Sequence, residues 1–160
     1  MLHIEIISVG KLKEDYLKSA ISEYAKRLSK YCTLQITEIP DEPIPDKLNE
    51  NIIEDIKNRE GKKILKAVKK NNFVFVLDRK GKQLSSEEFA QRIDDLSLGS
   101  VSSIRFIIGG SLGLSEEVLN SANELLCFSK MTFPHQLIRV FLLEQIFRCF
   151  KILNHETYHR

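Results

Sequence analysis

Residues 103–114 read SIRFIIGGSLGL, a largely apolar stretch that passes directly into a glycine-rich loop. In Ile104–Ile108 only Arg105 is polar, and such a stretch is typical of a strand that is buried in a parallel sheet. The run Phe73–Leu77 has the same character. Ligands of parallel α/β sheets bind at the carboxyl ends of the strands, so the loop Gly109–Gly113 also marks a candidate site.

The segments around these two runs alternate between strand-like and helix-like patterns. The remaining strand-like stretches are 2–9, 34–39 and 125–128, and the helix-like stretches are 17–31, 53–68, 86–96, 116–122 and 135–153. A capping box at Ser85-Ser86-Glu87-Glu88 marks the start of one of these helices. The alternation predicts one α/β domain over residues 1–160, with a mostly parallel sheet and helices on both faces.

The helix expected at 135–153 is apolar almost all the way round. A helix of this kind has to be covered on more than one side. A second copy of the chain across a two-fold axis is one source of that cover, and this interpretation predicts a homodimer. A central position in the core of a single subunit is the alternative.

The composition is that of a globular protein. Of 160 residues, 42% are hydrophobic and 29% are charged, which excludes the disordered and fibrous classes. The longest apolar runs are about five residues, whereas a membrane span needs about 20, and no secretory signal is expected. Cys32, Cys127 and Cys149 are odd in number and lack a C-x-x-C spacing, which favours a cytoplasmic protein without disulfides.

The net charge of +2 comes from 24 basic and 22 acidic side chains that are unevenly distributed. Residues 38–60 carry 3 basic and 8 acidic side chains, whereas residues 129–160 carry 5 basic and 2 acidic ones. The second segment also holds three of the four histidines. Such a segment fits contacts with nucleic-acid phosphates, and a solvated helix face is the alternative that charge alone leaves open.

Two short motifs resemble ligand-binding patterns without matching them fully. The loop Gly109–Gly113 is neither G-x-G-x-x-G nor a P-loop, so it is either a tight turn or a nucleotide contact. His155-Glu156-Thr157-Tyr158-His159 fits H-E-x-x-H, but a catalytic zinc needs a third protein ligand and only Arg160 follows. We therefore expect no metal site.

Polar residues of unusual type gather in the last fifth of the chain. They include the run Ser129–Gln136 and then Arg139, and His135 and Arg139 share one helix face because they are four residues apart. A His and an Arg on one helix face contribute little to core packing, which favours a functional role for them. The alternative is that they are ordinary solvated residues at the start of a helix.

Four stretches of the sequence occur together in one known enzyme family. They are Val9-Gly10-Lys11-Leu12-Lys13, Ile108-Gly109-Gly110-Ser111-x-Gly113, Phe128–Gln136 with Arg139, and Glu156-x-Tyr158-His159. In these stretches the chain resembles the RlmH family of SPOUT-class methyltransferases, although Leu112 stands where a polar residue is common. The resemblance implies an S-adenosyl-L-methionine-dependent enzyme that methylates N3 of a pseudouridine in 23S ribosomal RNA.

The same resemblance implies the architecture around the site. The C-terminal part of the chain is expected to form a trefoil knot, against the general rule that chains are unknotted. The family is dimeric, and the tail of one subunit is expected to complete the active site of the other. The implied contacts with S-adenosyl-L-methionine are Leu77, Gly109, Phe128, Ser129, Lys130, Met131, Thr132 and Phe133.

The resemblance also implies roles for residues outside the cofactor loops. His159 with Tyr158 is expected to orient the base and to assist the loss of the N3 proton, and Arg139 to stabilise negative charge on the pyrimidine. Packing at the dimer interface and holding RNA is the alternative for Tyr158 and His159. Contacts with RNA are expected from His135, Arg148, Lys151 and Arg160.

The expected partners are a second copy of the chain and 23S ribosomal RNA, in the large subunit or the assembled ribosome. No membrane and no metal are expected. Two other classes of function stay open from the sequence. One is a nucleotide-binding oxidoreductase or transferase that acts on a small metabolite, and the other is an RNA-binding ribosome factor without catalysis.

Overall fold

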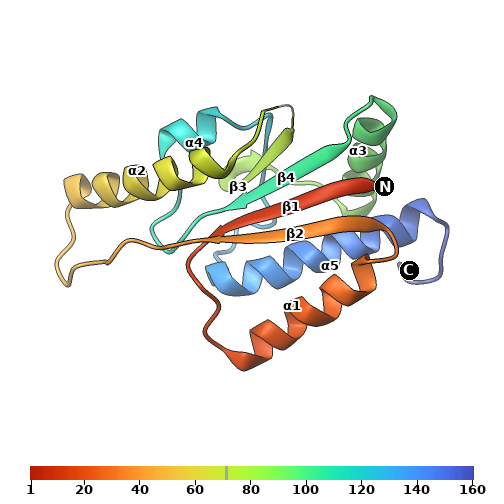
Figure 1. Ribbon diagram of the computed structural model, residues 1–160, viewed down its shortest axis with the longest axis horizontal. Helices are drawn as coiled ribbons and strands as arrows, with labels where there is room; N and C mark the ends of the chain where they lie inside the picture. The colour runs from red at the N-terminus through yellow and green to blue at the C-terminus, as the bar shows by residue number, and fades with distance from the viewer. Residues whose placement is uncertain (71) are drawn as a thin grey trace.

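The computed structural model describes residues 1–70 and 72–160, and within them strands and helices alternate along the chain (Figure 1). The strands are β1 (Leu2–Val9), β2 (Cys32–Ile39), β3 (Phe73–Lys82), β4 (Ser103–Ile108) and β5 (Glu124–Leu126). The helices are α1 (Asp15–Leu28), α2 (Glu50–Ala67), α3 (Ser86–Leu98), α4 (Glu116–Asn120) and α5 (His135–Leu153).

These strands form one sheet in the order β2-β1-β4-β3-β5, and every neighbouring pair is parallel. Helices α1, α3 and α5 pack on one face of the sheet, and α2 and α4 pack on the other (Figure 1). The predicted α/β fold with a parallel sheet and helices on both faces is confirmed. Because all strands run in one direction, their carboxyl ends and the loops that follow lie along one edge.

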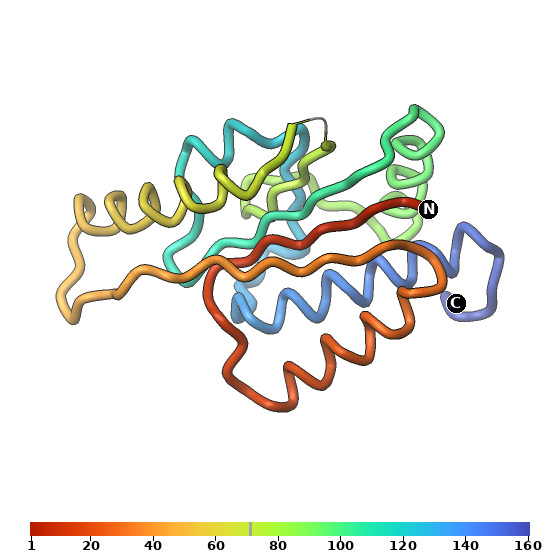
Figure 2. The backbone as a smooth tube through the Cα atoms, viewed as in Figure 1, coloured from red at the N-terminus to blue at the C-terminus, as the bar shows by residue number. Residues whose placement is uncertain are grey.

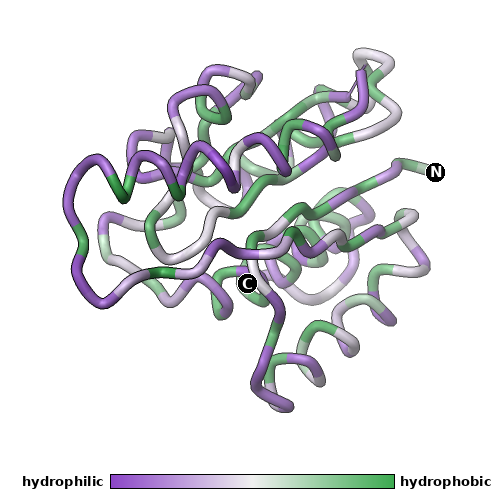
Figure 3. Tube along the Cα trace, turned by 60° about the vertical axis from the view of Figure 1, so that its left-hand side comes forward, coloured by the Kyte–Doolittle hydropathy of each residue, from purple (hydrophilic) through white to green (hydrophobic). Residues whose placement is uncertain are grey.

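Each face of the sheet has its own hydrophobic cluster. Alternate residues of β1 point to opposite faces: Ile4 and Ile6 join the cluster under α1, α3 and α5, whereas Ile7 and Val9 join the one under α2 and α4. Figure 3 shows hydrophobic residues along the strands and a largely hydrophilic segment leading into α2. Most of the acidic side chains of residues 38–60 are exposed, whereas Glu60 is buried.

Helix α5 starts at the carboxyl edge of the sheet and runs back towards its amino edge (Figure 2). It packs between α1 and α3, and Leu142, Leu143 and Ile146 on it are fully buried. Only Phe141 among its large apolar side chains is exposed, at 36%. The subunit itself thus covers most of α5, as the alternative of a central helix predicts. Of the helices in the described ranges, none has the length and apolar character needed to cross a lipid bilayer.

Strand β5 is shorter than the sequence predicts, because Cys127 and Phe128 belong to the loop after it. β3 is irregular beside it, since the register jumps so that Leu77 and Lys82 both pair with Leu126. The chain between them lies directly against β5. A Cβ atom on Gly81 would stand 2.6 Å from the backbone N and C atoms of Leu126, so only glycine fits this position.

We predict that Gly81→Ala destabilises the protein by more than about 2 kcal/mol, because backbone atoms of β5 cannot move aside as a side chain would. Gly99→Ala is the matched control, since Gly99 is exposed and its added Cβ would come no closer than 3.2 Å to the carbonyl oxygen of Asp95. Urea unfolding followed by circular dichroism measures both changes. Equal stability of the two variants would contradict the close crossing.

Candidate functional site

A cleft of about 620 Å³ lies at the carboxyl edge of the sheet. Its walls are residues 77–80, where the register of β3 shifts, residues 108–114 at the end of β4 and in the loop after it, and residues 126–129 and 131–135 at the end of β5 and beyond. Small-molecule sites in proteins commonly have volumes of about 300–1,000 Å³. The glycine loop that the sequence marked thus meets two other segments around one cleft of suitable size.

The loop after β4 forms a tight turn that is also a wall of this cleft. The N–H of Gly113 donates to the carbonyl of Gly110 at 3.1 Å, and Gly113 has a φ of 88°, which favours glycine. A Cβ on Gly109 would lie only 2.8 Å from the Cγ of Leu114. The three glycines therefore leave main chain of the loop accessible to whatever the cleft holds.

The loop after β5 is ordered by local hydrogen bonds rather than by a sheet or helix. The Met131 N–H donates to the Ser129 hydroxyl at 3.0 Å, and the Arg79 guanidinium donates to the Thr132 hydroxyl. Most main-chain groups of residues 127–134 lie outside any regular ladder. Such groups are able to pair with the polar groups of a ligand.

The structure brings together most of the positions at which the sequence predicted a cofactor. Lys130 is the exception, because its side chain is exposed and does not line the cleft. The predicted positions that line the cleft are Leu77, Gly109, Phe128, Ser129, Met131, Thr132 and Phe133.

His135 lies on the wall of the same cleft, at the first residue of α5. It is partly buried, and burial together with the nearby Arg139 guanidinium lowers the pKa of its imidazole. The ring is therefore neutral at physiological pH. A neutral imidazole has one donor and one acceptor nitrogen, which suits a hydrogen bond to a base better than an ion pair with a phosphate.

Arg139 is almost fully buried and is already engaged within its own subunit. Its Nη2 donates to the carbonyls of Val9 (2.7 Å) and Gly10 (3.0 Å), and its Nη1 donates to the Glu38 carboxylate at 3.1 Å. These contacts tie α5 to the ends of β1 and β2. Arg139 does not line the cleft. Its role within the subunit is to hold α5 against the ends of β1 and β2.

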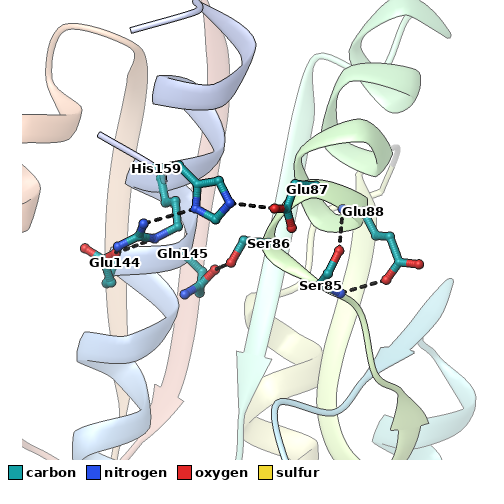
Figure 4. A network of polar contacts seen from close by, with 8 residues as sticks. Ser85, Ser86, Glu87, Glu88, Glu144, Gln145 and His159 are labelled. Carbon is teal, nitrogen blue, oxygen red and sulfur yellow. Dashed lines mark hydrogen bonds and ion pairs between the residues drawn. The ribbon is translucent and has the colours of Figure 1, made fainter. Parts of the chain in front are cut away.

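The last residues lie beside α5, and a polar network joins His159 to α5 and to the start of α3 (Figure 4). The Tyr158 hydroxyl donates to Glu144 at 2.7 Å. One ring nitrogen of His159 lies 3.2 Å from Arg148 and the other lies 2.6 Å from Glu87 at the start of α3. Side chains of α5 therefore hold both Tyr158 and His159, and a side chain of α3 also binds His159.

This network lies apart from the cleft of the same subunit. Arg148 comes ten residues after Ile138, the last residue of α5 that lines the cleft, which corresponds to about 15 Å along a helix axis. Tyr158, His159 and Arg148 do not line the cleft. The remaining predicted RNA contacts also lie on this side: Lys151 pairs with Glu156, and Arg160 is exposed at the chain end.

The H-E-x-x-H match does not lie on a helix. Helix α5 ends at Leu153, and His155 adopts a φ of 54°. Glu156 accepts a hydrogen bond from the Tyr31 hydroxyl at 2.9 Å, while His159 faces Glu87. Across residues 1–70 and 72–160, no three His, Cys, Asp or Glu side chains gather as metal ligands would.

Sequence reasoning missed the acidic partners of the predicted site residues. Glu38 holds Arg139, Glu87 faces His159 and Glu144 accepts from Tyr158. Glu87 belongs to a recognised capping box, but only Ser85 and Glu88 satisfy the helix start, which leaves Glu87 free for His159. The available signal in the sequence was that Glu87 lies in the first turn of a helix and has no capping role, so its carboxylate can bind another residue.

Comparisons with known proteins agree on one family. A family model described as a predicted SPOUT methyltransferase matches residues 2–159. A protein of Clostridium botulinum (strain 657 / Type Ba4) named ribosomal RNA large subunit methyltransferase H is 59% identical, and the match covers 99% of this chain and 100% of that protein. A protein of the same name from Clostridium acetobutylicum is 57% identical with the same coverage.

A solved structure supports the fold. A probable methylase family protein from Haemophilus influenzae Rd KW20 aligns with 100% of this chain and 72% of its own, at a TM-score of 0.60 and 13% identity. At that identity the likeness concerns the fold alone.

We predict that Arg139→Met lowers the free energy of unfolding by about 3 kcal/mol, because two buried carbonyls lose their donor and Glu38 loses its counter-charge. Arg59→Met is the control, since Arg59 forms an exposed pair with Asp55 and its loss changes stability by less than about 0.5 kcal/mol. Chemical unfolding of both variants tests this. An unchanged free energy of unfolding for Arg139→Met would show that the contacts of Arg139 do not stabilise the fold.

Proposed function

This chain belongs to the SPOUT methyltransferase family, and from that premise we propose that it methylates N3 of a pseudouridine in large-subunit ribosomal RNA with S-adenosylmethionine as donor. The observation that carries the proposal is the cleft between residues 77–80 of β3, the glycine loop after β4 and the loop after β5. Family membership decides against the oxidoreductase interpretation of the glycine loop. It also implies the C-terminal trefoil knot.

The residues of the cleft fit S-adenosylmethionine. The donor has no phosphates and thus needs no P-loop, whereas its adenine, ribose and amino-acid parts need main-chain partners and apolar cover. The loops at Gly109–Gly113 and 127–134 supply main-chain groups, and Leu77, Phe128 and Ile138 supply apolar walls. When bound, the donor supplies an electrophilic methyl group on a sulfonium.

The chain's own residues then have to position the base and remove a proton. Methyl transfer is a displacement that depends on alignment, and the imide N3–H of the pyrimidine must be lost. His135 is the titratable side chain of α5 on the wall of the cleft. Its neutral ring is placed to hydrogen-bond the substrate base.

The tail residues are proposed to serve the cleft of a second subunit. Tyr158 and His159 are held by Glu144 and Arg148, which lie about 9 Å and about 15 Å along α5 beyond Ile138, the last residue of this helix that lines the cleft of their own chain. A homodimer in which the tail of one subunit faces the cleft of its partner brings the two together. The exposed rings of Phe133 and Phe141, packed edge to face at 5.5 Å, provide an apolar surface beside the cleft for such a contact.

The hydrogen bonds of His159 define which ring nitrogen carries the proton. A guanidinium has donors alone, so Arg148 donates to Nδ1 and the remaining proton sits on Nε2, which donates to Glu87. The hydrogen bond from His159 lowers the pKa of Glu87, so that carboxylate stays ionised. Burial, and then Glu144, raise the pKa of Tyr158, so its hydroxyl remains a donor. His159 accepts the N3 proton once Nδ1 leaves Arg148.

Arg139 has a different role in this proposal from the one the sequence suggested. Its guanidinium would have to leave Val9, Gly10 and Glu38 to reach a pyrimidine oxygen. We therefore assign it to positioning the start of α5. Arg148, Lys151 and Arg160 remain proposed contacts with RNA, in the large subunit or the assembled ribosome.

The first test is methyl incorporation. We expect the wild-type protein to transfer methyl groups from S-adenosylmethionine to ribosomes from a strain that lacks the modification, with mass spectrometry placing the methyl on the pseudouridine. His159→Ala is expected to lower kcat by about 10²–10⁴-fold with unchanged affinity for the donor, as loss of a general base does. Full methylation by His159→Ala would remove its assignment as the base, and no methylation by the wild type would leave a non-catalytic ribosome factor.

Mixing two inactive variants tests the shared site. Gly109→Val forces the glycine loop away from Leu114 and so disrupts a wall of the cleft but keeps the tail, whereas His159→Ala keeps the cleft. After unfolding and refolding together in equal amounts, random pairing gives about one quarter of the wild-type number of intact sites if the tail acts on the partner. If the tail acted on its own subunit, each mixed dimer would contain no intact site and the mixture would stay inactive.

A further inference from the structure

The loop that follows β1 lies at the same edge of the sheet as the cleft. β1 pairs with β4, and Ser8 stands opposite Ile108, the last residue before the glycine loop. A Cβ on Gly110 would lie 3.2 Å from Cγ1 of Val9, so the two loops start side by side. Residues 10–13 belong to a stretch that carries the family resemblance, yet the proposed function gives them no role.

This loop is held by contacts from three directions. The Leu12 N–H donates to the Glu38 carboxylate at 2.9 Å, and Arg139 donates to the carbonyl of Gly10 at 3.0 Å. Gln136 donates to the carbonyl of Lys11 at 3.4 Å. Gly10 has a φ of 89°, a value that glycine alone adopts without strain. The main chain of residues 10–12 is thus fixed although it belongs to no helix or strand.

The first turn of α5 connects the loop to the cleft. His135 and Ile138 on this turn line the cleft, whereas Gln136 and Arg139 on the same turn hold the loop. The loop therefore keeps a fixed position relative to the groups that receive the donor and the base. An ordered loop loses little entropy when it binds a substrate.

The side chains that this loop presents are cationic. Lys11 and Lys13 are exposed, and within the described residues neither amine forms an ion pair. Glu38 is paired with Arg139. The acids nearest in sequence are Glu14 and Asp15 at the start of α1, and Asp41 lies close to Gly10, but none of them forms an ion pair with Lys11 or Lys13 within the described residues.

We propose that residues 10–13 form a subsite for the RNA backbone, in which Lys11 and Lys13 bind phosphates beside the target nucleotide. Glu38 and Arg139 are positioning residues for it. The inference rests on the proposed function, because the substrate is taken to be RNA. Phosphate contacts fix the register of a nucleic acid on a protein without reading its sequence, which is what a cleft that takes one base needs next to it.

The test compares Lys11→Ala/Lys13→Ala with Lys69→Ala/Lys70→Ala, which removes two exposed lysines before β3, at the opposite edge of the sheet. Binding of the dimer to ribosomes and the methylation KM are measured at 50 and 200 mM salt, and donor affinity by calorimetry. We expect the salt increase to weaken wild-type binding about tenfold more than binding of the Lys11/Lys13 variant, since each phosphate contact contributes about threefold over that range. Donor affinity is expected to stay unchanged, and Lys11→Arg/Lys13→Arg to restore binding.

The outcomes separate the subsite from the function. Equal KM and equal salt dependence for the two double variants would overturn the subsite while methylation by the wild type still stood. If the wild type bound ribosomes without methylating them, the proposed function would fail, and the salt dependence of binding would still decide the role of the loop. Weaker donor binding in the Lys11/Lys13 variant would show that the loop shapes the cleft instead, and would overturn the proposal.

Discussion

The buried guanidinium of Arg139 joins parts of the chain that are far apart in sequence. It comes from the last helix, and it binds the carbonyls at the end of the first strand and a carboxylate at the end of the second. Burying a cation without such partners costs several kcal/mol, so the contact fixes the start of α5 strongly. Because His135 and Gln136 occupy the same turn, the cleft wall and the loop after β1 take their positions from this one interaction.

A second constraint is the close approach of main chain to main chain. At Gly81 the chain crosses β5 with no room for a Cβ, and at Gly109 the loop folds onto Leu114. Both crossings draw strand-end loops towards each other and leave peptide groups, not side chains, on the walls. A site built this way recognises the shape and hydrogen-bonding edges of a ligand, which suits a neutral adenosine better than a phosphate chain.

The fold was predictable where the pattern of apolar residues reflects burial. The largely apolar stretches Ile104–Ile108 and Phe73–Leu77 belong to strands buried between two helical layers, and α5 has the bounds that its apolar residues predict. Strand β5 was predicted too long, because its end depends on the register of Lys82 in another strand. The partners of Arg139 are mostly backbone carbonyls. Every residue has a carbonyl, so the residue types in the sequence do not predict which ones Arg139 binds. The sequence therefore located the loops of the site but not what holds them.

Ion pairs within the subunit change how the distribution of charge along the chain should be interpreted. Residues 129–160 carry five basic side chains, but Arg139, Arg148 and Lys151 each bind a carboxylate of their own subunit. A paired cation contributes a short-range dipole rather than a long-range field, so the excess counted in this segment overstates its attraction for RNA. Lys11 and Lys13 lie in a segment with a smaller excess, yet no carboxylate among the described residues neutralises them. Contacts in space, rather than charge summed along the sequence, decide which lysines a phosphate backbone meets.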